Sequence, residues 1–219
     1  MSRPRVVAID GAAGAGKSTL ARALARYLEL PYVNTGEMYR ALAAAALRDG
    51  VDPDDVAGLM RLVRALRFVV SSGPDRHLEV EGWPRPALHT PEVESTVSVV
   101  ARHPEVRSHL RAAQRAMVGD GAVMEGRDIA SVVVPEAPVK IFVTAEPEVR
   151  ARRRAAERPS AAHDAVGDAL RLRDARDAVT NPLEPAVGAE VLDTSELDVG
   201  AALAEALAIV RRLAPEMVR

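Results

Sequence analysis

The segment from Gly11 to Ser18 has the residue types and the spacing of a loop that binds phosphate. It reads Gly-Ala-Ala-Gly-Ala-Gly-Lys-Ser and matches G-x-x-x-x-G-K-[ST]. Its glycines let backbone N–H groups turn inward around a phosphate, Lys17 reaches the β- and γ-phosphates, and the Ser18 hydroxyl suits Mg²⁺. The sequence therefore predicts ATP and Mg²⁺ as cofactors, with Ser18 as the metal ligand and the nucleotide bound by Gly11, Ala12, Ala13, Gly14, Ala15, Gly16, Lys17, Ser18 and Thr19.

Lysine is scarce in this chain, which makes the lysine of the loop informative. Lysine and arginine together number 29, yet the lysines are Lys17 and Lys140 alone. An ammonium is a compact point charge and a guanidinium is a wide planar fork, so Lys17 stands where only the ammonium fits. A GTPase would carry an Asn-Lys-x-Asp motif that reads guanine, and neither lysine follows an asparagine. The sequence therefore excludes a GTPase of that kind.

Scattered arginines could supply the second half of a phosphoryl-transfer site. Two polyphosphates repel each other, so a transfer between them needs cations on the acceptor side. The candidates are Arg40, Arg107, Arg127 and the arginines of residues 150–154 and 173–177. Residues 150–154 also fit a solvated helix face that pairs with neighbouring glutamates. Next to a phosphate loop we instead expect a helical lid over about residues 150–177, with Arg153 as a catalytic residue.

The elements that must position these residues alternate between strands and helices. Residues 6–9 form a short apolar run that ends where the loop begins, and leucines at helical spacing follow Lys17. Thr35 opens an alanine-rich helix that Asp49-Gly50 ends. Further buried strands are predicted at residues 31–34, 122–124, 139–143 and 191–192. The fold class is therefore predicted to be α/β, a parallel sheet of the P-loop NTPase type flanked by helices.

The middle of the chain departs from this alternation. A helix over residues 53–67 is followed by two short apolar runs, 68–70 and 78–80, that flank Ser71-Ser72-Gly73-Pro74-Asp75. This pattern predicts a hairpin inserted into the α/β rhythm. Thr90-Pro91 then starts a helix, and His103-Pro104 separates it from a second helix that runs to about Met117.

The composition of the chain argues against several other classes of function. The 219 residues carry a net charge of −2, which gives no electrostatic reason to bind nucleic acid or a membrane surface. There is no cysteine, and the histidines show no metal spacing. No stretch of about 20 residues is apolar throughout, and no apolar targeting segment is present. We expect a cytoplasmic monomer that acts on small molecules.

Taken together, the motifs resemble the bacterial cytidylate kinase family over nearly the whole chain. The segments that carry the resemblance are Ile9-Asp10-Gly11, Asn34-Thr35-Gly36 with Tyr39-Arg40, Glu125-Gly126-Arg127-Asp128, residues 137–142, Arg173-Asp174 with Arg176-Asp177, and Leu192-Asp193-Thr194. The resemblance implies a single kinase domain over residues 1–219. Its core would comprise residues 1–67 and 118–219, and its inserted subdomain for the nucleoside monophosphate would comprise about residues 68–117.

The resemblance also implies a role for each matching residue in binding CMP or dCMP. Thr35, Tyr39 and Arg40 would form one wall of the monophosphate site, with Arg40 on the phosphate. The remaining positions are Ser98, Arg107 and Asp128 for the cytosine edge, Arg127 for phosphate and catalysis, and Arg173 with Asp177 for the sugar. Cytosine presents an amine donor beside two acceptors, so a carboxylate with Arg and Ser is a complementary set.

Two departures from the family pattern bear on the site. Glu125 stands where the family often has Asp, and residues 178–183 lack a further phosphate-binding arginine that many members carry. Arg176 or an arginine of residues 150–154 is our candidate to replace it. The residues alone also leave open a P-loop kinase for UMP, AMP, shikimate or dephospho-coenzyme A, and a nucleotide-dependent switch without an acceptor.

Overall fold

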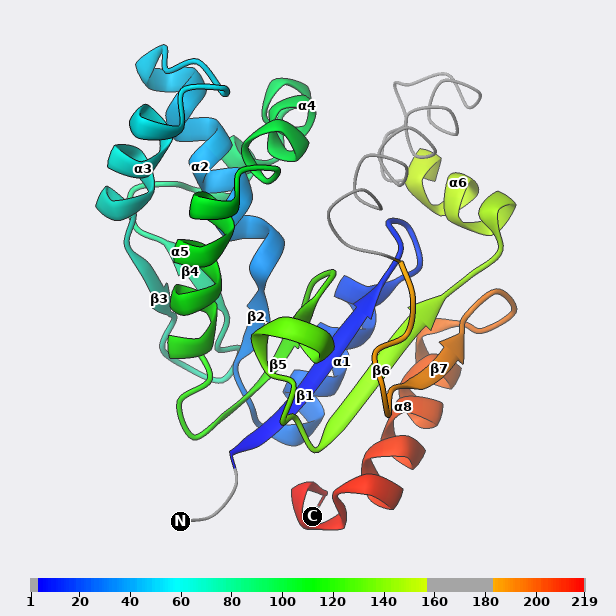
Figure 1. Cartoon of the computed structure of the whole chain (residues 1–219). Coiled ribbons are helices and arrows are strands. Elements are labelled where there is room, and N and C mark those ends of the chain that lie inside the picture. Colours follow the sequence, from blue (N-terminus) through cyan, green and yellow to red (C-terminus); the bar gives the residue numbers. More distant parts are fainter. Residues whose placement is uncertain (1–3, 157–182, 219) are drawn as a thin grey trace.

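Five parallel strands form the central sheet in the part of the chain that the structure describes. The computed structural model describes residues 4–156 and 183–218. The strands are β1 (Arg5–Gly11), β2 (Tyr32–Asn34), β5 (Gly121–Glu125), β6 (Val139–Thr144) and β7 (Glu190–Asp193), in the order β2-β5-β1-β6-β7 (Figure 1). The predicted parallel sheet is therefore confirmed. Its carboxyl ends all lie at one edge, at the top of Figure 1, where ligands of open α/β sheets bind.

Both faces of this sheet are buried, which explains the unbroken apolar run at its centre. Val6 and Ala8 of β1 pack into one core, while Val7 and Ile9 pack into the other. Successive residues of a strand point to opposite faces, so a strand covered on both sides is apolar at every position. Helices α1 (Lys17–Leu28) and α8 (Val199–Leu213) cover one face.

The other face of the sheet is covered by the helices of residues 35–116. These elements are α2 (Thr35–Asp49), α3 (Val56–Ala65), η1 (Arg85–Leu88), α4 (Pro91–Val100) and α5 (Pro104–Ala116). Side-chain caps set the starts of α2, α3 and α4: Asn34 accepts from Gly36 N–H, Asp55 from Gly58 N–H and Thr90 from Val93 N–H. The cap at Asp55 explains why α3 is shorter than the predicted helix over residues 53–67.

The predicted hairpin is present as an antiparallel pair. Strands β3 (Phe68–Val70) and β4 (Leu78–Val80) pair with Phe68 opposite Val80. Their buried residues share one core with α2, α3, α4 and α5, and all of these elements lie on the left of Figure 1. The division into a core and an insertion at residues 68 and 117 stays a prediction.

A π-helical turn follows β5 and has no counterpart in the predicted elements. This turn, η2 (Ile129–Val133), begins where the buried Asp10 carboxylate accepts hydrogen bonds from the N–H groups of Ile129 (2.9 Å) and Ala130 (2.7 Å). Asp10 lies at the end of β1, so the bonds tie the β5 loop to the start of the phosphate loop. They fix the backbone immediately after Arg127 and Asp128.

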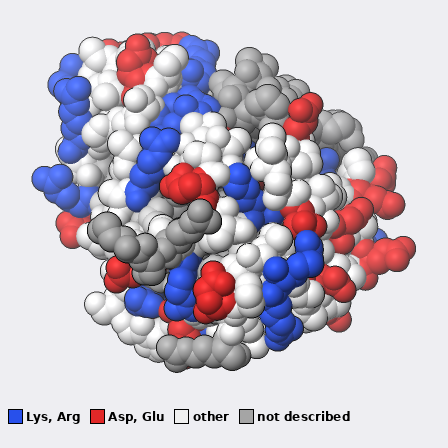
Figure 2. Space-filling view, turned by 60° about the horizontal axis from the view of Figure 1, so that its bottom comes forward, with Lys and Arg blue, Asp and Glu red and all other residues white. Residues whose placement is uncertain are grey.

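Helix α6 (Pro147–Ala156) follows β6 and stands beside the phosphate loop, and η3 (Pro215–Met217) closes the chain. The predicted lid over residues 150–177 starts in α6, but residues 157–177 lie outside the described part. No helix in the described residues is long and apolar enough to span a membrane. On the face shown in Figure 2, basic and acidic side chains lie side by side over much of the surface.

Candidate active site

The glycine loop connects β1 to α1 at the carboxyl edge of the sheet. A Cβ on Gly11 would lie 2.0 Å from the Val143 carbonyl oxygen of β6, so no other residue fits there without moving the backbone. Gly16 has a φ of 84° and caps α1, whose first residue is Lys17. The Lys17 ammonium donates a 2.6 Å hydrogen bond to the Ala12 carbonyl oxygen, so the side chain folds back across the phosphate loop.

The hydroxyl of Ser18 is bound to a buried carboxylate from the neighbouring strand. Ser18 Oγ donates to Glu125 Oε2 over 2.9 Å, and the Tyr32 hydroxyl donates to Glu125 Oε1. Thr35 Oγ1 donates to the Glu125 carbonyl oxygen over 2.8 Å. Glu125 is only 3% exposed, so the Ser18 and Tyr32 hydroxyls stabilise a carboxylate charge that burial would otherwise disfavour.

The oxygen ligands at Ser18 fit Mg²⁺ shared with a nucleotide. Magnesium prefers oxygen donors and is usually bound through one or two protein groups together with substrate phosphates. Ser18 and Glu125 supply such groups next to the phosphate loop. The described residues contain no cluster of three or more His, Cys, Asp or Glu that would hold a metal unaided. The donor set therefore fits an ion that arrives with its phosphates.

A cavity of about 430 Å³ extends from the phosphate loop to the acceptor-side helices. Thirteen of the predicted site residues line it: Ala13, Gly14, Gly16, Lys17, Ser18, Thr19, Thr35, Tyr39, Arg40, Ser98, Arg107, Arg127 and Asp128. Gly11, Ala12, Ala15 and Arg153 are not among its lining residues. The thirteen predicted residues come from the phosphate loop, α1, α2, α4, α5 and the loop after β5. The fold therefore brings predicted site residues from distant parts of the chain to one cavity.

The acceptor-side arginines are positioned by contacts with the protein itself. Arg127 donates to the Gly11 carbonyl oxygen over 3.0 Å, which places its guanidinium beside the phosphate loop. Arg40 is 9% exposed, donates to the Leu88 carbonyl oxygen over 3.3 Å and lies 3.7 Å from Glu94. Arg107 donates to Asp128 over 3.2 Å. The guanidinium groups of these three arginines thus line the same cavity as Lys17.

Tyr39 contributes a hydroxyl that stays protonated. Burial, reinforced by the nearby Asp128 carboxylate, raises the pKa of Tyr39 to about 12. It therefore remains a neutral hydrogen-bond donor and acceptor at physiological pH. Burial also raises the pKa of Asp10, to about 6, although the two backbone N–H groups that donate to its carboxylate lower that pKa.

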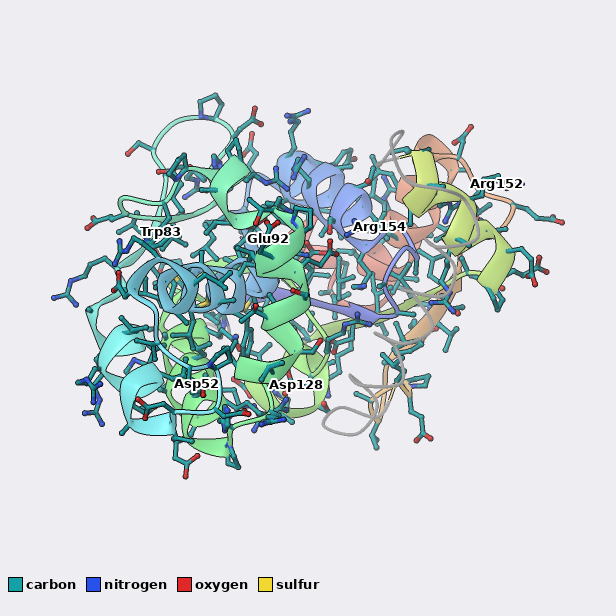
Figure 3. All side chains as sticks on the ribbon, turned by 90° about the horizontal axis from the view of Figure 1, so that it is seen from above. Asp52, Trp83, Glu92, Asp128, Arg152 and Arg154 are labelled. Atoms are coloured by element: carbon teal, nitrogen blue, oxygen red, sulfur yellow. The ribbon has the colours of Figure 1, made fainter. Side chains whose placement is uncertain are left out.

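Helix α6 presents two arginines to different surroundings. Arg153 donates to Thr194 Oγ1 (2.9 Å) and to the Thr194 carbonyl oxygen (2.6 Å), at the end of β7. Arg154 lines the cavity and forms an ion pair with Glu94 of α4. In Figure 3 the labelled Arg154 lies toward α4. The catalytic role of Arg153 stays a prediction, and Arg173 and Asp177 lie outside the described residues.

Sequence reasoning gave no role to Arg111 and no specific role to Glu125 or Arg154, which the fold brings to this site. Glu125 appeared as part of a motif and as a departure from the family pattern, although an acidic residue at the end of a strand beside the phosphate loop is a signal for a metal-linked carboxylate. Arg154 was one of the candidate arginines of residues 150–154. Arg111 donates to Asp128 from the turn of α5 after Arg107, and no sequence signal distinguished it.

A second and larger hollow, about 650 Å³, lies between α1, β2 and the β3–β4 hairpin. Trp83, Tyr32 and Glu37 are among the residues that line it. It lacks the phosphate loop's Lys17 and Ser18, so size alone does not identify the reactive site. The two hollows share Arg22, Asn34 and Arg85 in their walls.

Comparison with known proteins places this geometry in a family. The family model described as cytidylate kinase matches residues 7–212. A cytidylate kinase of Thermus thermophilus is 44% identical over 209 residues, with 94% of this chain and 99% of that protein covered. Cytidylate kinases of Pelotomaculum thermopropionicum and Mycobacterium avium are 45% and 41% identical, and the alignments cover 88% and 90% of this chain with 90% and 91% of those proteins.

Solved structures of lower sequence identity share the fold. A sugar kinase from Janibacter has a TM-score of 0.51 at 17% identity, with 99% of each chain covered. An uncharacterized protein from Eubacterium ventriosum has a TM-score of 0.52 at 12% identity, with 96% of this chain and 99% of that chain covered. The family match, the identities above 40% over most of the chain and the shared fold agree. This chain belongs to the cytidylate kinase family.

Proposed function

We propose that this protein transfers the γ-phosphoryl group of Mg-ATP to CMP or dCMP, giving ADP and CDP or dCDP. One observation carries the proposal: the phosphate loop and the acceptor-side arginines line a single cavity. Two nucleotides bound from opposite ends would meet in it. The names of the relatives support the choice of acceptor.

The phosphate loop would hold ATP by its backbone N–H groups and by the positive end of α1. Lys17 would leave its bond to the Ala12 carbonyl for the β- and γ-phosphate oxygens. Ser18 and Glu125 would hold Mg²⁺, directly or through water, and the bound ion would neutralise charge on the transferred group. The protein needs no covalent chemistry, since positioning and charge stabilisation account for most of phosphoryl transfer.

The acceptor would lie against the opposite wall of the cavity. Arg40 and Arg127 would bind the phosphate of CMP, with Thr35 and Tyr39 beside it. Asp128, Arg107 and Ser98 would face the cytosine edge, because an amine donor next to two acceptors needs one acceptor and two donors. Arg173 and Asp177 would contact the sugar.

Closure over the two nucleotides would involve α6 and the residues that follow it. The contact between Arg154 of α6 and Glu94 of α4 joins the lid side of the cavity to the acceptor side. We propose residues 150–177 as the lid, with Arg153 as its catalytic arginine. A closed site excludes water, which would otherwise take the phosphoryl group.

The test is an initial-rate measurement of ADP formation with Mg-ATP and one acceptor at a time. We expect CMP and dCMP to support multiple turnovers, with UMP, AMP, shikimate and dephospho-coenzyme A far weaker. A Lys17→Ala protein purified in parallel controls for contaminating kinases. Preference for another acceptor would overturn the choice of CMP, and ATP binding without any acceptor-dependent turnover would favour a nucleotide-dependent switch.

A further inference from the structure

Two arginines, one turn apart on α5, hold the same carboxylate of the loop after β5. Arg111 donates to Asp128 Oδ2 through Nη2 (2.6 Å) and Nε (3.2 Å), and Arg107 donates to the same oxygen through Nη2 (3.2 Å). Residues four apart on a helix share a face, so both guanidiniums reach Asp128 from one side. In Figure 3 the labelled Asp128 lies beside this helix.

The two oxygens of Asp128 differ in what surrounds them. Every hydrogen bond that the described residues donate to this carboxylate goes to Oδ2. Oδ1 thus keeps its lone pairs for another donor. Asp128 and Arg107 line the substrate cavity, whereas Arg111 is not among the described residues that do. Arg111 therefore holds the carboxylate from behind the cavity wall.

Burial strengthens the contact between Arg111 and Asp128 and limits the movement of the Asp128 carboxylate. The side chains of Asp128 and Arg107 are 14% and 9% exposed, and that of Arg111 is 25% exposed. A charged hydrogen bond is screened less by water at such positions than on the open surface, and two donors of one guanidinium converge on Oδ2. A rotation of the carboxylate that moved Oδ2 out of this position would break both Arg111 bonds.

A fixed acceptor in this position discriminates between pyrimidines. Cytosine carries an amine on C4, which donates, while uracil carries a carbonyl oxygen there, which accepts. An Asp128 free to swing aside would let Arg107 meet the uracil oxygen. An Asp128 held in place sets two acceptors against each other, and a polar group left unpaired in a buried site is strongly rejected.

We propose that Arg111 is the positioning residue that makes this site reject UMP, by holding Asp128 with one oxygen directed at the base. The inference rests on the proposed function, since it requires CMP to be an acceptor. It differs from base contact itself, because Arg111 acts only through Asp128. It also predicts that the acceptor preference, and not only the rate, depends on a residue outside the cavity wall.

The experiment compares Arg111→Met, Arg111→Lys and Arg115→Met with the wild type. Methionine keeps the length and the helix propensity of arginine but removes both donors, and lysine keeps the charge with one donor group. Arg115 is the matched control, because it lies one turn further along α5 and donates to the Val132 and Val133 carbonyl oxygens instead of Asp128. For each protein we would measure kcat/KM for CMP and for UMP, and the equilibrium Kd of each without ATP.

We expect Arg111→Met to lower the CMP-to-UMP ratio of kcat/KM about tenfold, the scale of one charge-assisted hydrogen bond, with the same trend in Kd. Arg111→Lys should fall between Met and the wild type, and Arg115→Met should keep the wild-type ratio. If Arg111→Met does not fold, an Arg111→Lys ratio equal to the wild type overturns the proposal. An unchanged ratio in folded Arg111→Met overturns it as well, whereas a wild type inactive on CMP refutes the proposed function instead.

Discussion

The hydroxyl of Ser18 lies 2.9 Å from Oε2 of Glu125 and donates a hydrogen bond to it. The pair joins the first turn of α1 to the last residue of β5, across 107 positions of sequence. Tyr32 donates to the other oxygen from β2. The Glu125 carboxylate thus contacts two neighbouring elements at once.

Replacing Glu125 by Gln should weaken the response to Mg²⁺. The amide keeps the shape but loses the negative charge that orients Ser18 and any water on the ion. Loss of such an outer partner typically costs about ten- to a hundredfold in metal affinity. We expect the Mg²⁺ concentration for half-maximal rate, at fixed ATP and saturating CMP, to rise by about that factor.

Tyr32→Phe is the matched control for Glu125→Gln. It removes a hydrogen bond from the same carboxylate but leaves the charge in place. We expect it to lower the free energy of unfolding by about 1–3 kcal/mol, measured by urea denaturation, because Glu125 loses a buried donor. Its Mg²⁺ dependence should stay nearer to the wild type, and a Glu125→Gln protein with unaltered Mg²⁺ dependence contradicts the role given to Glu125.

Lys17→Ala should affect turnover far more than acceptor binding. In the proposed function the Lys17 ammonium would act on the β- and γ-phosphates, where charge develops, and it lines the cavity beside the phosphate loop. We expect kcat to fall about a hundred- to a thousandfold, as for loss of one preorganised donor, with a much smaller change in the KM for CMP. Steady-state kinetics at saturating Mg-ATP decide this, and unimpaired turnover would refute the assignment.

Asp10→Asn should change the way stability depends on pH. Burial raises the pKa of Asp10 to about 6 from an ordinary 3.8, so the folded chain holds its proton more tightly than the unfolded chain. The stabilising contribution of protonation is complete below about pH 4 and is lost as the pH rises through 6. Relative to Asp10→Asn, the wild type should gain roughly 2 kcal/mol in unfolding free energy from pH 7 to pH 4.

Urea denaturation of both proteins at pH steps between 4 and 7 measures this difference. The titration of all other groups is common to the two proteins, so it cancels in the comparison. Parallel curves over that range would show that Asp10 is not the titrating group.

Arg154→Ala and Arg153→Ala separate the roles of two neighbouring arginines of α6. Arg154 lines the cavity, so its loss should lower kcat about tenfold or more while the fold is kept. Arg153 holds the end of β7, so Arg153→Ala should also lower the free energy of unfolding by about 1–3 kcal/mol. Rates and denaturation curves for the same preparations test both expectations, and wild-type kcat in Arg154→Ala would contradict the first.

The sequence could predict the central sheet because its signals are local. Strands such as β1 are buried on both faces and read as continuous apolar runs, and the loop from Gly11 to Ser18 needs fixed residue types at fixed spacing. Thr90 followed by Pro91 marked a helix start in the same way, whereas the cap that the structure shows for α2 is Asn34 and not Thr35. The resemblance to a family supplied the roles of the acceptor-side residues.

Other features depend on contacts between distant segments and had no local signal. The π-helical turn η2 depends on Asp10, which lies 119 residues from Ile129. The hydrogen bonds from Arg111 to Asp128 require α5 to lie beside the loop after β5. The hydrophobic periodicity of a sequence cannot show which elements lie side by side. Monomeric state, cytoplasmic location and the roles of residues 157–182 stay predictions.

The wall shared by the two hollows has a practical consequence for inhibitor design. Arg22, Asn34 and Arg85 each face both the reactive cavity and the larger space under the β3–β4 hairpin. A compound bound in that larger space that shifted one of these three side chains would therefore reshape the wall of the other cavity without occupying it.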